Sequence, residues 1–146
     1  MGEEARIMAV LSIFKSKKKK SRKSYLIEQI DAIISLQVRN RDGWTCRKCG
    51  RRAVKKNDVA NHHIFGKKAH PATRWNLENC LSLCFWCHRD AHASPEDFRR
   101  WVISWMGEKE YEALYIKAQY RAKFKEVDLE WMLKDMRKQS IKVIGL

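Results

Sequence analysis

Two Cys-x-x-Cys pairs constrain the fold of this chain more than any other feature of its sequence. The first pair is Cys46 with Cys49, the second is Cys84 with Cys87, and Gly50 directly follows the first. Two intervening residues let a tight turn aim both sulfur atoms at one point, and two such turns supply the four thiolates of a tetrahedral zinc site. Glycine suits such a turn because it accepts left-handed backbone angles. We therefore expect one bound zinc ion, with a redox dithiol as the alternative.

A zinc ion with four protein ligands has no coordination position left for a substrate, so its expected role is structural. It would join the start of a central unit to its end, and the strands between the pairs are too short to be stable alone. The fifth cysteine, Cys80, lies within one of these strands and is expected to pack in the core.

Composition narrows the class of partner. The chain has 146 residues, enough for one compact domain with extensions, and a net charge of +14. Such a charge attracts polyanions, either nucleic acid or an anionic membrane surface. No segment is long and apolar enough to span a bilayer, and we expect no signal peptide. A cytoplasmic protein is therefore predicted, and its clustered cysteines should hold metal because thiols stay reduced there.

Histidines are concentrated between and after the cysteine pairs. The segment from Val59 to Ile64 is typical of a short strand and contains His62 and His63. Residues 79–83 predict a second strand, and residues 88–92 a short helix. His88 and His92 stand four residues apart, so they share one helix face and can bind one metal ion.

Hydrophobic periodicity predicts helices on both sides of this central unit. One covers residues 24–39 and ends before the turn at residues 42–43. Another begins at Ser94, a cap residue followed by proline, and ends at Gly107. Apolar stripes over residues 111–118 and 129–136 predict two more helices, whose aromatic and Met residues are expected to lie in the core.

The order of these motifs resembles the HNH (His-Asn-His) endonucleases of the ββα-metal superfamily, especially small phage and bacterial members with a four-cysteine zinc site. The resemblance covers residues 41–93 and rests on His62-His63-Ile64, Asn79, and the run from Leu83 through His88 to His92. It implies two antiparallel strands and a helix that clasp one divalent ion. It also implies a bacterial cell, or a host cell infected by phage, as the setting.

The resemblance also implies roles for individual residues. His63 corresponds to the general base, and Asn79 to the asparagine that pins the loop between the strands and so orients that base. The ligands of the catalytic ion would be His62, His88 and His92. Strict alternation along a strand sends His62 and His63 to opposite faces, so the strand must bend or end there for both to reach one phosphate. Unlike many members, this chain has Phe65-Gly66 where a proline is common.

Basic residues are the candidate contacts to DNA phosphates. Residues 15–23 form a run without an acid, which is expected to be flexible when free, and a second basic stretch lies in the loop after residue 66. The predicted nucleic-acid contacts are Lys17, Lys18, Lys19, Lys20, Arg22, Lys23, Lys67, Lys68 and Arg74. His70, in the same loop, is expected to be a surface residue.

These patterns predict an α+β fold with a ββα-metal nuclease core, stapled by a four-cysteine zinc site and flanked by N- and C-terminal helices. The chain divides into a basic segment (1–23), a helix with the nuclease core (24–93) and a helical extension (94–146). We expect no membrane partner, whereas a homodimer or another nucleic-acid-processing protein is left open.

The predicted function is metal-dependent hydrolysis of phosphodiester bonds in DNA. A neutral imidazole can take a proton from water, and a divalent ion, Mn²⁺, Ni²⁺, Co²⁺ or Mg²⁺, can hold the scissile phosphate. Two alternatives remain: a zinc-stabilised DNA-binding module without catalysis, and a nuclease that acts on RNA.

Overall fold

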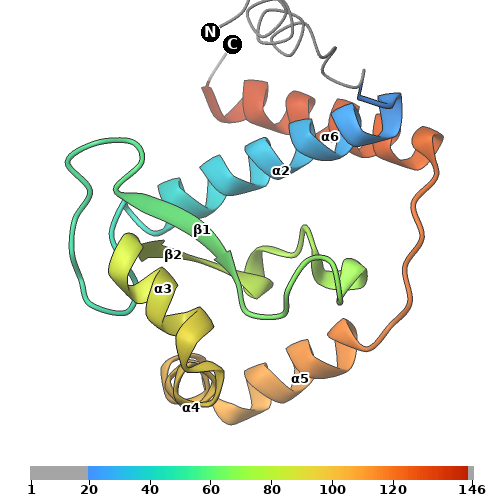
Figure 1. Cartoon of the computed structure of the whole chain (residues 1–146). Coiled ribbons are helices and arrows are strands. Elements are labelled where there is room, and N and C mark those ends of the chain that lie inside the picture. The colour runs from blue at the N-terminus through green and yellow to red at the C-terminus, as the bar shows by residue number, and fades with distance from the viewer. Residues whose placement is uncertain (1–19, 145–146) are drawn as a thin grey trace, which may run out of the picture.

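A two-stranded antiparallel sheet lies at the centre of the molecule, with helices on both of its faces (Figure 1). The computed structural model describes residues 20–144, and residues 140–144 by their backbone only. The fold of this part is α+β, as predicted. Its elements are α2 (Arg22–Arg41), β1 (Val59–His63), β2 (Cys80–Cys84), α3 (Phe85–Ala93), α4 (Pro95–Met106), α5 (Glu108–Ala118) and α6 (Glu126–Ile144), with short 3-10 turns at Pro71–Thr73 and Leu77–Asn79.

The register of the sheet sets which residues face each other. Val59 pairs with Cys84 and His63 pairs with Cys80 at the two ends of the ladder. All five residues of β2 are buried, so both faces of this strand are covered. Leu81 and Leu83 pack with α3 and α4 on one face, whereas Cys80 packs with α2 and α6 on the other. The sheet thus separates two small hydrophobic cores, and Cys80 is a core residue as predicted.

Helix α2 covers one face of the sheet with a stripe of apolar residues. Leu26, Ile30, Ile34 and Val38 recur every four residues and are all buried. The helix is longer at both ends than the predicted 24–39. Its first turn starts within the basic run because the Ser21 hydroxyl accepts a hydrogen bond from the Ser24 N–H at 3.2 Å and caps it.

The end of α2 is joined to β2 by a charged pair. Asp42 is 7% exposed, accepts a hydrogen bond from the Arg41 guanidinium at 2.8 Å, and accepts another from the Ser82 backbone N–H at 2.8 Å. The same guanidinium donates to the carbonyls of Leu77 and Cys80, both at 2.8 Å. The buried charge is therefore paired and fully hydrogen-bonded, as burial requires.

Helix α3 begins earlier than the predicted residue 88. It starts at Phe85, directly after β2, so the second cysteine pair spans the junction between strand and helix instead of a tight turn. Asn79 likewise lies in a 3-10 turn, and β2 begins one residue later. The helical turn still places two cysteines three residues apart on the same side, which is the outcome that the spacing requires.

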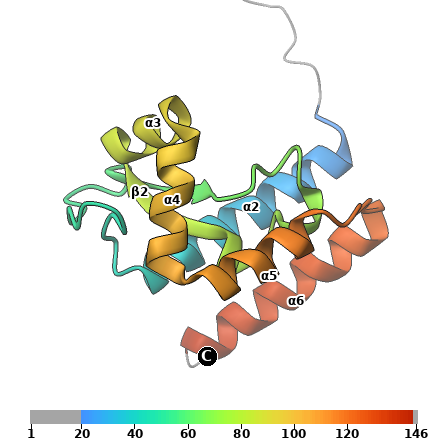
Figure 2. The same cartoon turned by 90° about the horizontal axis from the view of Figure 1, so that it is seen from below.

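The C-terminal helices wrap around the sheet and return to α2. Helix α4 runs from Pro95 to Met106, between the predicted Ser94 and Gly107, although Ser94 makes no side-chain cap hydrogen bond. Helix α6 lies along α2 (Figures 1 and 2), and its Leu129 and Leu133 complete the core that Ile30 belongs to. Tyr115 departs from the predicted core stripe because its side chain is 45% exposed. None of the described helices has the length and apolar character to cross a membrane.

The α2–α6 core predicts a large effect of truncating Leu129, which is 0% exposed. Leu129→Ala should lower the free energy of unfolding by about 2–5 kcal/mol, because it removes buried methyl groups and leaves a cavity. Denaturant unfolding measures this loss. Val127→Ala, at a position on the same helix that is 51% exposed, should change stability by no more than about 0.5 kcal/mol. Equal effects of the two substitutions would contradict the packing of α6 on α2.

Candidate active site

The four cysteines of the two pairs come together in one cluster. Their Sγ atoms all lie within 4.8 Å of one another, and the Cys49 and Cys84 sulfurs are 3.7 Å apart. Cys49 is exposed, whereas Cys46, Cys84 and Cys87 are buried. Four thiolates that converge without a carboxylate among them fit a structural zinc ion.

Backbone geometry prepares this cluster for a metal. The Cys46 N–H donates to the Arg51 carbonyl, the Gly50 N–H donates to the Cys46 carbonyl, and Gly50 adopts a φ of 75°. Burial raises the pKa of the Cys46 thiol. The backbone N–H groups of Cys49, Cys84 and Lys48 together lower it by more, so the pKa is about 7. These N–H groups stabilise the thiolate, which is the form that binds zinc.

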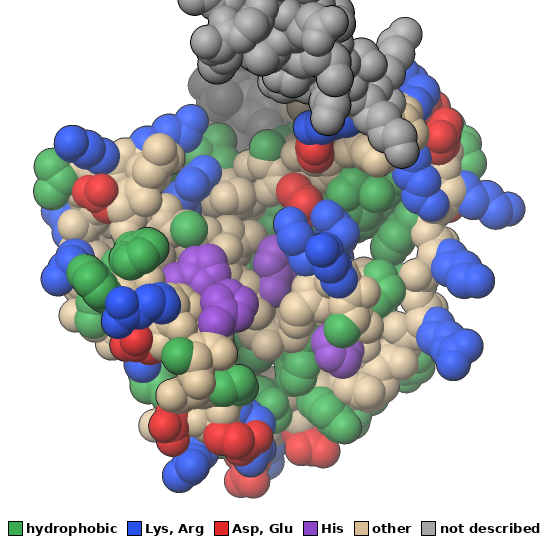
Figure 3. All heavy atoms as spheres, in the orientation of Figure 1, with side chains coloured by type: hydrophobic (Ala, Val, Ile, Leu, Met, Phe, Trp, Pro, Cys, Tyr) green, Lys and Arg blue, Asp and Glu red, His purple; other side chains and the backbone are tan. Residues whose placement is uncertain are grey.

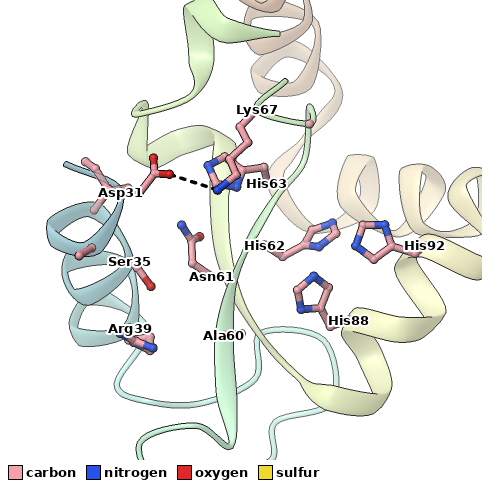
Figure 4. Close-up of a pocket in the computed structure, with 13 residues that line it drawn as sticks. Asp31, Ser35, Arg39, Ala60, Asn61, His62, His63, Lys67, His88 and His92 are labelled. Atoms are coloured by element: carbon pink, nitrogen blue, oxygen red, sulfur yellow. Dashed lines mark hydrogen bonds and ion pairs between the residues drawn. The ribbon is translucent and has the colours of Figure 1, made fainter. Parts of the chain in front are cut away.

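Three histidines form a second cluster, between β1 and α3. His62 comes from β1, and His88 and His92 come from α3; one ring nitrogen of each lies within 4.8 Å of the others (Figure 4). His62 is 6% exposed, and its ring is edge-on to His88 at 4.8 Å between centroids. Burial, together with the neighbouring histidines, lowers the pKa of His62 to about 3. His62 therefore presents a neutral imidazole, the form that can act as a metal ligand.

His63 lies on the other side of β1, toward α2, as strand alternation requires (Figure 4). Its Nε2 is 2.9 Å from the Arg74 carbonyl oxygen. A carbonyl only accepts, so Nε2 carries the proton and Nδ1 of the neutral ring is free to accept one. Burial lowers the pKa of His63, and Lys67 lowers it too, although the hydrogen bond to Arg74 opposes this.

Asp31 on α2 holds the loop that carries the Arg74 carbonyl. It accepts two hydrogen bonds from the Arg74 guanidinium, at 3.0 and 2.7 Å, one from the Trp75 indole at 2.8 Å, and one from Lys67 at 3.1 Å. Burial raises the pKa of the Asp31 carboxyl, but these hydrogen bonds outweigh it, and the pKa lies below its usual value. The carboxylate is thus stabilised in its charged form.

This pairing changes the interpretation of Arg74. The sequence predicts it as a phosphate contact, but its side chain is 19% exposed and its charge is neutralised by Asp31. Its backbone carbonyl, not its side chain, contacts His63. Lys67 is 42% exposed and Lys68 is exposed, so their predicted contacts to nucleic acid stay predictions.

Asn79 joins the end of β1 to the following loop. Its side chain is 0% exposed; its Oδ1 accepts from the Phe65 N–H at 2.8 Å, and its Nδ2 donates to the carbonyls of Phe65 at 2.9 Å and Thr73 at 3.1 Å. The hydrogen bonds of this buried amide are made to Phe65 and Thr73, so Asn79 holds both ends of the loop between them.

One cleft connects the two sets of histidines. It has a volume of about 570 Å³ and runs between α2 and α3, with β1 as its floor. His63 lines it together with the three clustered histidines, and Figure 3 shows histidines in a hollow of this face with Lys and Arg beside it. Strand β1 ends at His63, so both adjacent histidines border the same space although they lie on opposite faces.

The α2 wall of this cleft contains residues that the sequence analysis missed. Asp31, Ser35 and Arg39 line it at successive intervals of four residues, and Asn61 of β1 lies beside them. The Arg39 Nε and Asn61 Oδ1 atoms are buried without a hydrogen-bond partner in the described part of the chain. The four-residue spacing of Asp31, Ser35 and Arg39 was present in the sequence, and on a helix it places them on one face.

Several predicted surface residues have partners instead. Lys17, Lys18 and Lys19 lie outside the described residues. Lys20 pairs with Glu28 at 2.6 Å and Arg22 pairs with Glu130 at 2.6 Å, so acids from α2 and α6 neutralise this end of the basic run, while Lys23 is exposed.

His70 is half-buried, contrary to the surface position expected, and its Nδ1 donates to the Ala118 carbonyl at 3.0 Å. It connects the loop to α5.

The sulfur cluster predicts that folding depends on zinc. Cys84→Ser should lower bound zinc well below one ion per chain and reduce the melting temperature, because the short strands lose their tie to the loop after α2. Elemental analysis and thermal melts on the same samples measure both. Cys80→Ala is the matched control: this buried cysteine lies outside the cluster, so its variant should keep its zinc. A Cys84→Ser protein that melts normally without zinc would end this assignment.

The Asp31 network predicts a pH-dependent contribution to stability. Asp31→Asn should destabilise the protein by about 1–2 kcal/mol at pH 7, because Arg74 and Lys67 lose their charged acceptor. A lowered carboxyl pKa contributes stability above the unfolded pKa near about 4, and this is lost as the pH falls through the folded value. The difference between wild type and Asp31→Asn in denaturant unfolding should therefore vanish at low pH. Asp97→Asn, in an ion pair with both side chains 72% exposed, should have little effect at either pH.

Comparison with known proteins identifies the family but no closer relative. No curated protein and no solved structure matches this chain. A family model described as "Bacteriophage Lambda NinG protein" matches residues 9–144, which is nearly the whole sequence. This chain, with its four-cysteine cluster, therefore belongs to the NinG protein family.

Proposed function

We propose that this protein is a metal-dependent nuclease of the HNH type that hydrolyses phosphodiester bonds in DNA. The observation that carries the proposal is the convergence of His62, His88 and His92 within 4.8 Å, from one strand of an antiparallel pair and from the helix that follows it. A fourth histidine, His63, borders the same cleft. A ββα arrangement with these donors is what the HNH resemblance implies.

The three-histidine cluster fits a transition ion. Its donors are imidazole nitrogens, which suit Mn²⁺, Co²⁺ or Ni²⁺ better than Mg²⁺, an ion that prefers oxygen. Such an ion, when bound, would supply charge to hold the scissile phosphate and to stabilise the leaving 3′-oxygen. His62 is fixed by burial among Phe98 and the helix histidines, whereas His92 is exposed and leaves the cluster open toward the cleft.

His63 is the proposed general base. Its Nε2–H is held by the Arg74 carbonyl, so Nδ1 is the atom that takes the proton from the attacking water. The lowered pKa of His63 keeps this nitrogen unprotonated at neutral pH. His62 and His63 thus have different proposed roles. His62 faces the metal ligands of α3 and binds the ion, whereas His63 faces the opposite wall of the cleft and accepts the proton.

The surrounding residues keep this base in place. Asp31 fixes the Arg74 side chain, and Asn79 fixes both ends of the loop that leads to it. A general base must lie within hydrogen-bond reach, about 3 Å between heavy atoms, of the group that it deprotonates, so small movements of the loop carry a large cost in rate. Asp31 and Asn79 are therefore positioning residues that act through His63.

The net charge of +14 supports a polyanionic substrate. Lys67 lines the cleft and is 42% exposed beside its ion-pair partner Asp31, which supports a phosphate contact there. The phosphate chemistry of such a site does not distinguish the sugars. DNA is therefore proposed as substrate and RNA is tested beside it.

The direct experiment incubates zinc-loaded protein with supercoiled plasmid, single-stranded DNA or RNA and with Mn²⁺, Co²⁺, Ni²⁺ or Mg²⁺ in turn. We expect the plasmid to be nicked or linearised, with the transition ions at least as effective as Mg²⁺. Cleavage of RNA alone would favour the RNA nuclease. Binding of DNA without cleavage by any ion would favour the zinc-stabilised binding module and reject the proposal.

His63→Ala separates catalysis from binding. The cleavage rate should fall by about 10²- to 10⁴-fold, the usual contribution of a general base, while DNA affinity and bound metal stay unchanged. His70→Ala is a matched control, because His70 also donates one ring N–H to a backbone carbonyl, but to Ala118 on α5. Because His70 lies in the loop that positions His63, its variant should lose far less activity than His63→Ala. A His63→Ala protein that keeps its metals and cleaves as fast as wild type would refute the role of His63.

A further inference from the structure

The loop that carries the first cysteine pair has charged side chains of one sign only. Every charged side chain in residues 43–57 is Lys or Arg, and all of them are exposed. Within the described part of the chain, none of them forms an ion pair. These residues are Arg47, Lys48, Arg51, Arg52, Lys55 and Lys56. No role is predicted for them from the sequence, and structural zinc binding requires none of their charges.

Two exposed aromatic side chains lie next to this loop. Phe85 is 69% exposed and Trp86 is 50% exposed, and their rings meet edge to face at 5.3 Å between centroids. The Arg89 guanidinium lies 4.6 Å from the centre of the Trp86 ring. Exposed pairs of large aromatic residues on a small domain mark a contact surface, because each leaves apolar area in water.

The sulfur cluster brings the charges and the rings together. Arg47 and Lys48 stand between the cysteines of the first pair, and Phe85 and Trp86 stand between those of the second. Since all four sulfurs lie within 4.8 Å of one another, both dipeptides flank the same point. In Figure 1 the loop lies beside the start of α3, and in Figure 3 Lys and Arg side chains gather along this edge with hydrophobic side chains among them.

We propose that this zinc-loop surface, made of residues 47–56 with Phe85, Trp86 and Arg89, binds a single strand of DNA. Cations along a loop match the phosphates of a strand, and flat exposed rings match the faces of unpaired bases. In a duplex the base faces are stacked on each other and are not available, so the aromatic pair favours a single strand.

The position of the surface relates it to the proposed cleavage site. Phe85 is in the first turn of α3, three residues before His88, a rise of about 4.5 Å along the helix. A strand stacked on the aromatic pair is therefore held beside the three-histidine cluster. The choice of DNA rests on the proposed function, but binding by this surface requires no cleavage.

The test measures affinity for a labelled oligo(dT) and for a duplex of equal length, without any added divalent ion, using the full chain with its zinc content determined. Phe85→Leu/Trp86→Leu keeps both side chains apolar but removes the rings, and should weaken oligo(dT) binding by about tenfold or more. Phe85→Tyr/Trp86→Tyr keeps an aromatic ring at both positions and should bind oligo(dT) with an affinity close to that of wild type. Trp131→Leu, at an aromatic residue on α6 that is 67% exposed, is the matched control and should bind as wild type does.

The cationic part is tested by salt dependence. Arg51→Ala/Arg52→Ala should reduce the slope of log affinity against log salt by about 1.4, because two phosphate contacts to a single strand are lost. Arg121→Ala/Lys123→Ala removes the same charge from the exposed segment between α5 and α6, on the opposite side of the molecule in Figure 1, and should leave the slope unchanged.

Equal oligo(dT) affinity of the Leu double variant and wild type, at equal zinc content, would overturn the proposal. So would a loss that is the same for duplex and single strand, since stacking on unpaired bases would then not be involved. A protein that fails to cleave any nucleic acid would reject the proposed nuclease and leave this binding result intact.

Discussion

A sheet of two five-residue strands is only marginally stable in water, so the whole site depends on what fastens β1 and β2 from outside. On one face the Arg41–Asp42 pair joins the end of α2 to the backbone of β2, through hydrogen bonds that satisfy a buried carboxylate. At the far end of β2, the sulfur cluster joins the strand to the loop after α2. Between these two fastenings the strands have little freedom to slip in register, and register decides which histidine faces which helix.

The consequence of a fixed register is seen at two adjacent residues. His62 faces α3 and meets His88 and His92, while His63 faces α2 and the loop that Asp31 holds. A slip by one residue would exchange these two environments, since side chains alternate along a strand. The proposed division between metal binding and proton transfer is therefore a property of strand geometry. It needs no bend in β1, only the end of the strand at His63 beside an open cleft.

Among the described residues of this protein, some cationic side chains form ion pairs within the fold, and others face solvent without one. Arg22, Arg41 and Arg74 are each paired with a carboxylate, and two of them join elements that are distant in sequence. The cations of the zinc loop have no such partner among the described residues. A count of Lys and Arg predicts a polyanion as partner, but the count alone cannot separate arginines that hold the fold from those free to meet a phosphate.

The sequence by itself determined the local features of this protein, because spacing within a turn or a helix is set by neighbouring residues. The cysteine pairs, the four-residue interval between His88 and His92, the core position of Cys80 and the start of α4 at Pro95 were all predictable in this way. Contacts between distant segments were decided only by the tertiary structure. Asp31 meets Arg74 across 43 positions and α6 returns to α2, and no periodicity encodes such a pairing. Whether a polar side chain meets water or a partner depends on which elements pack beside it. This is why the sequence did not predict the half-burial of His70 or the pairing of Lys20 and Arg22 with acids.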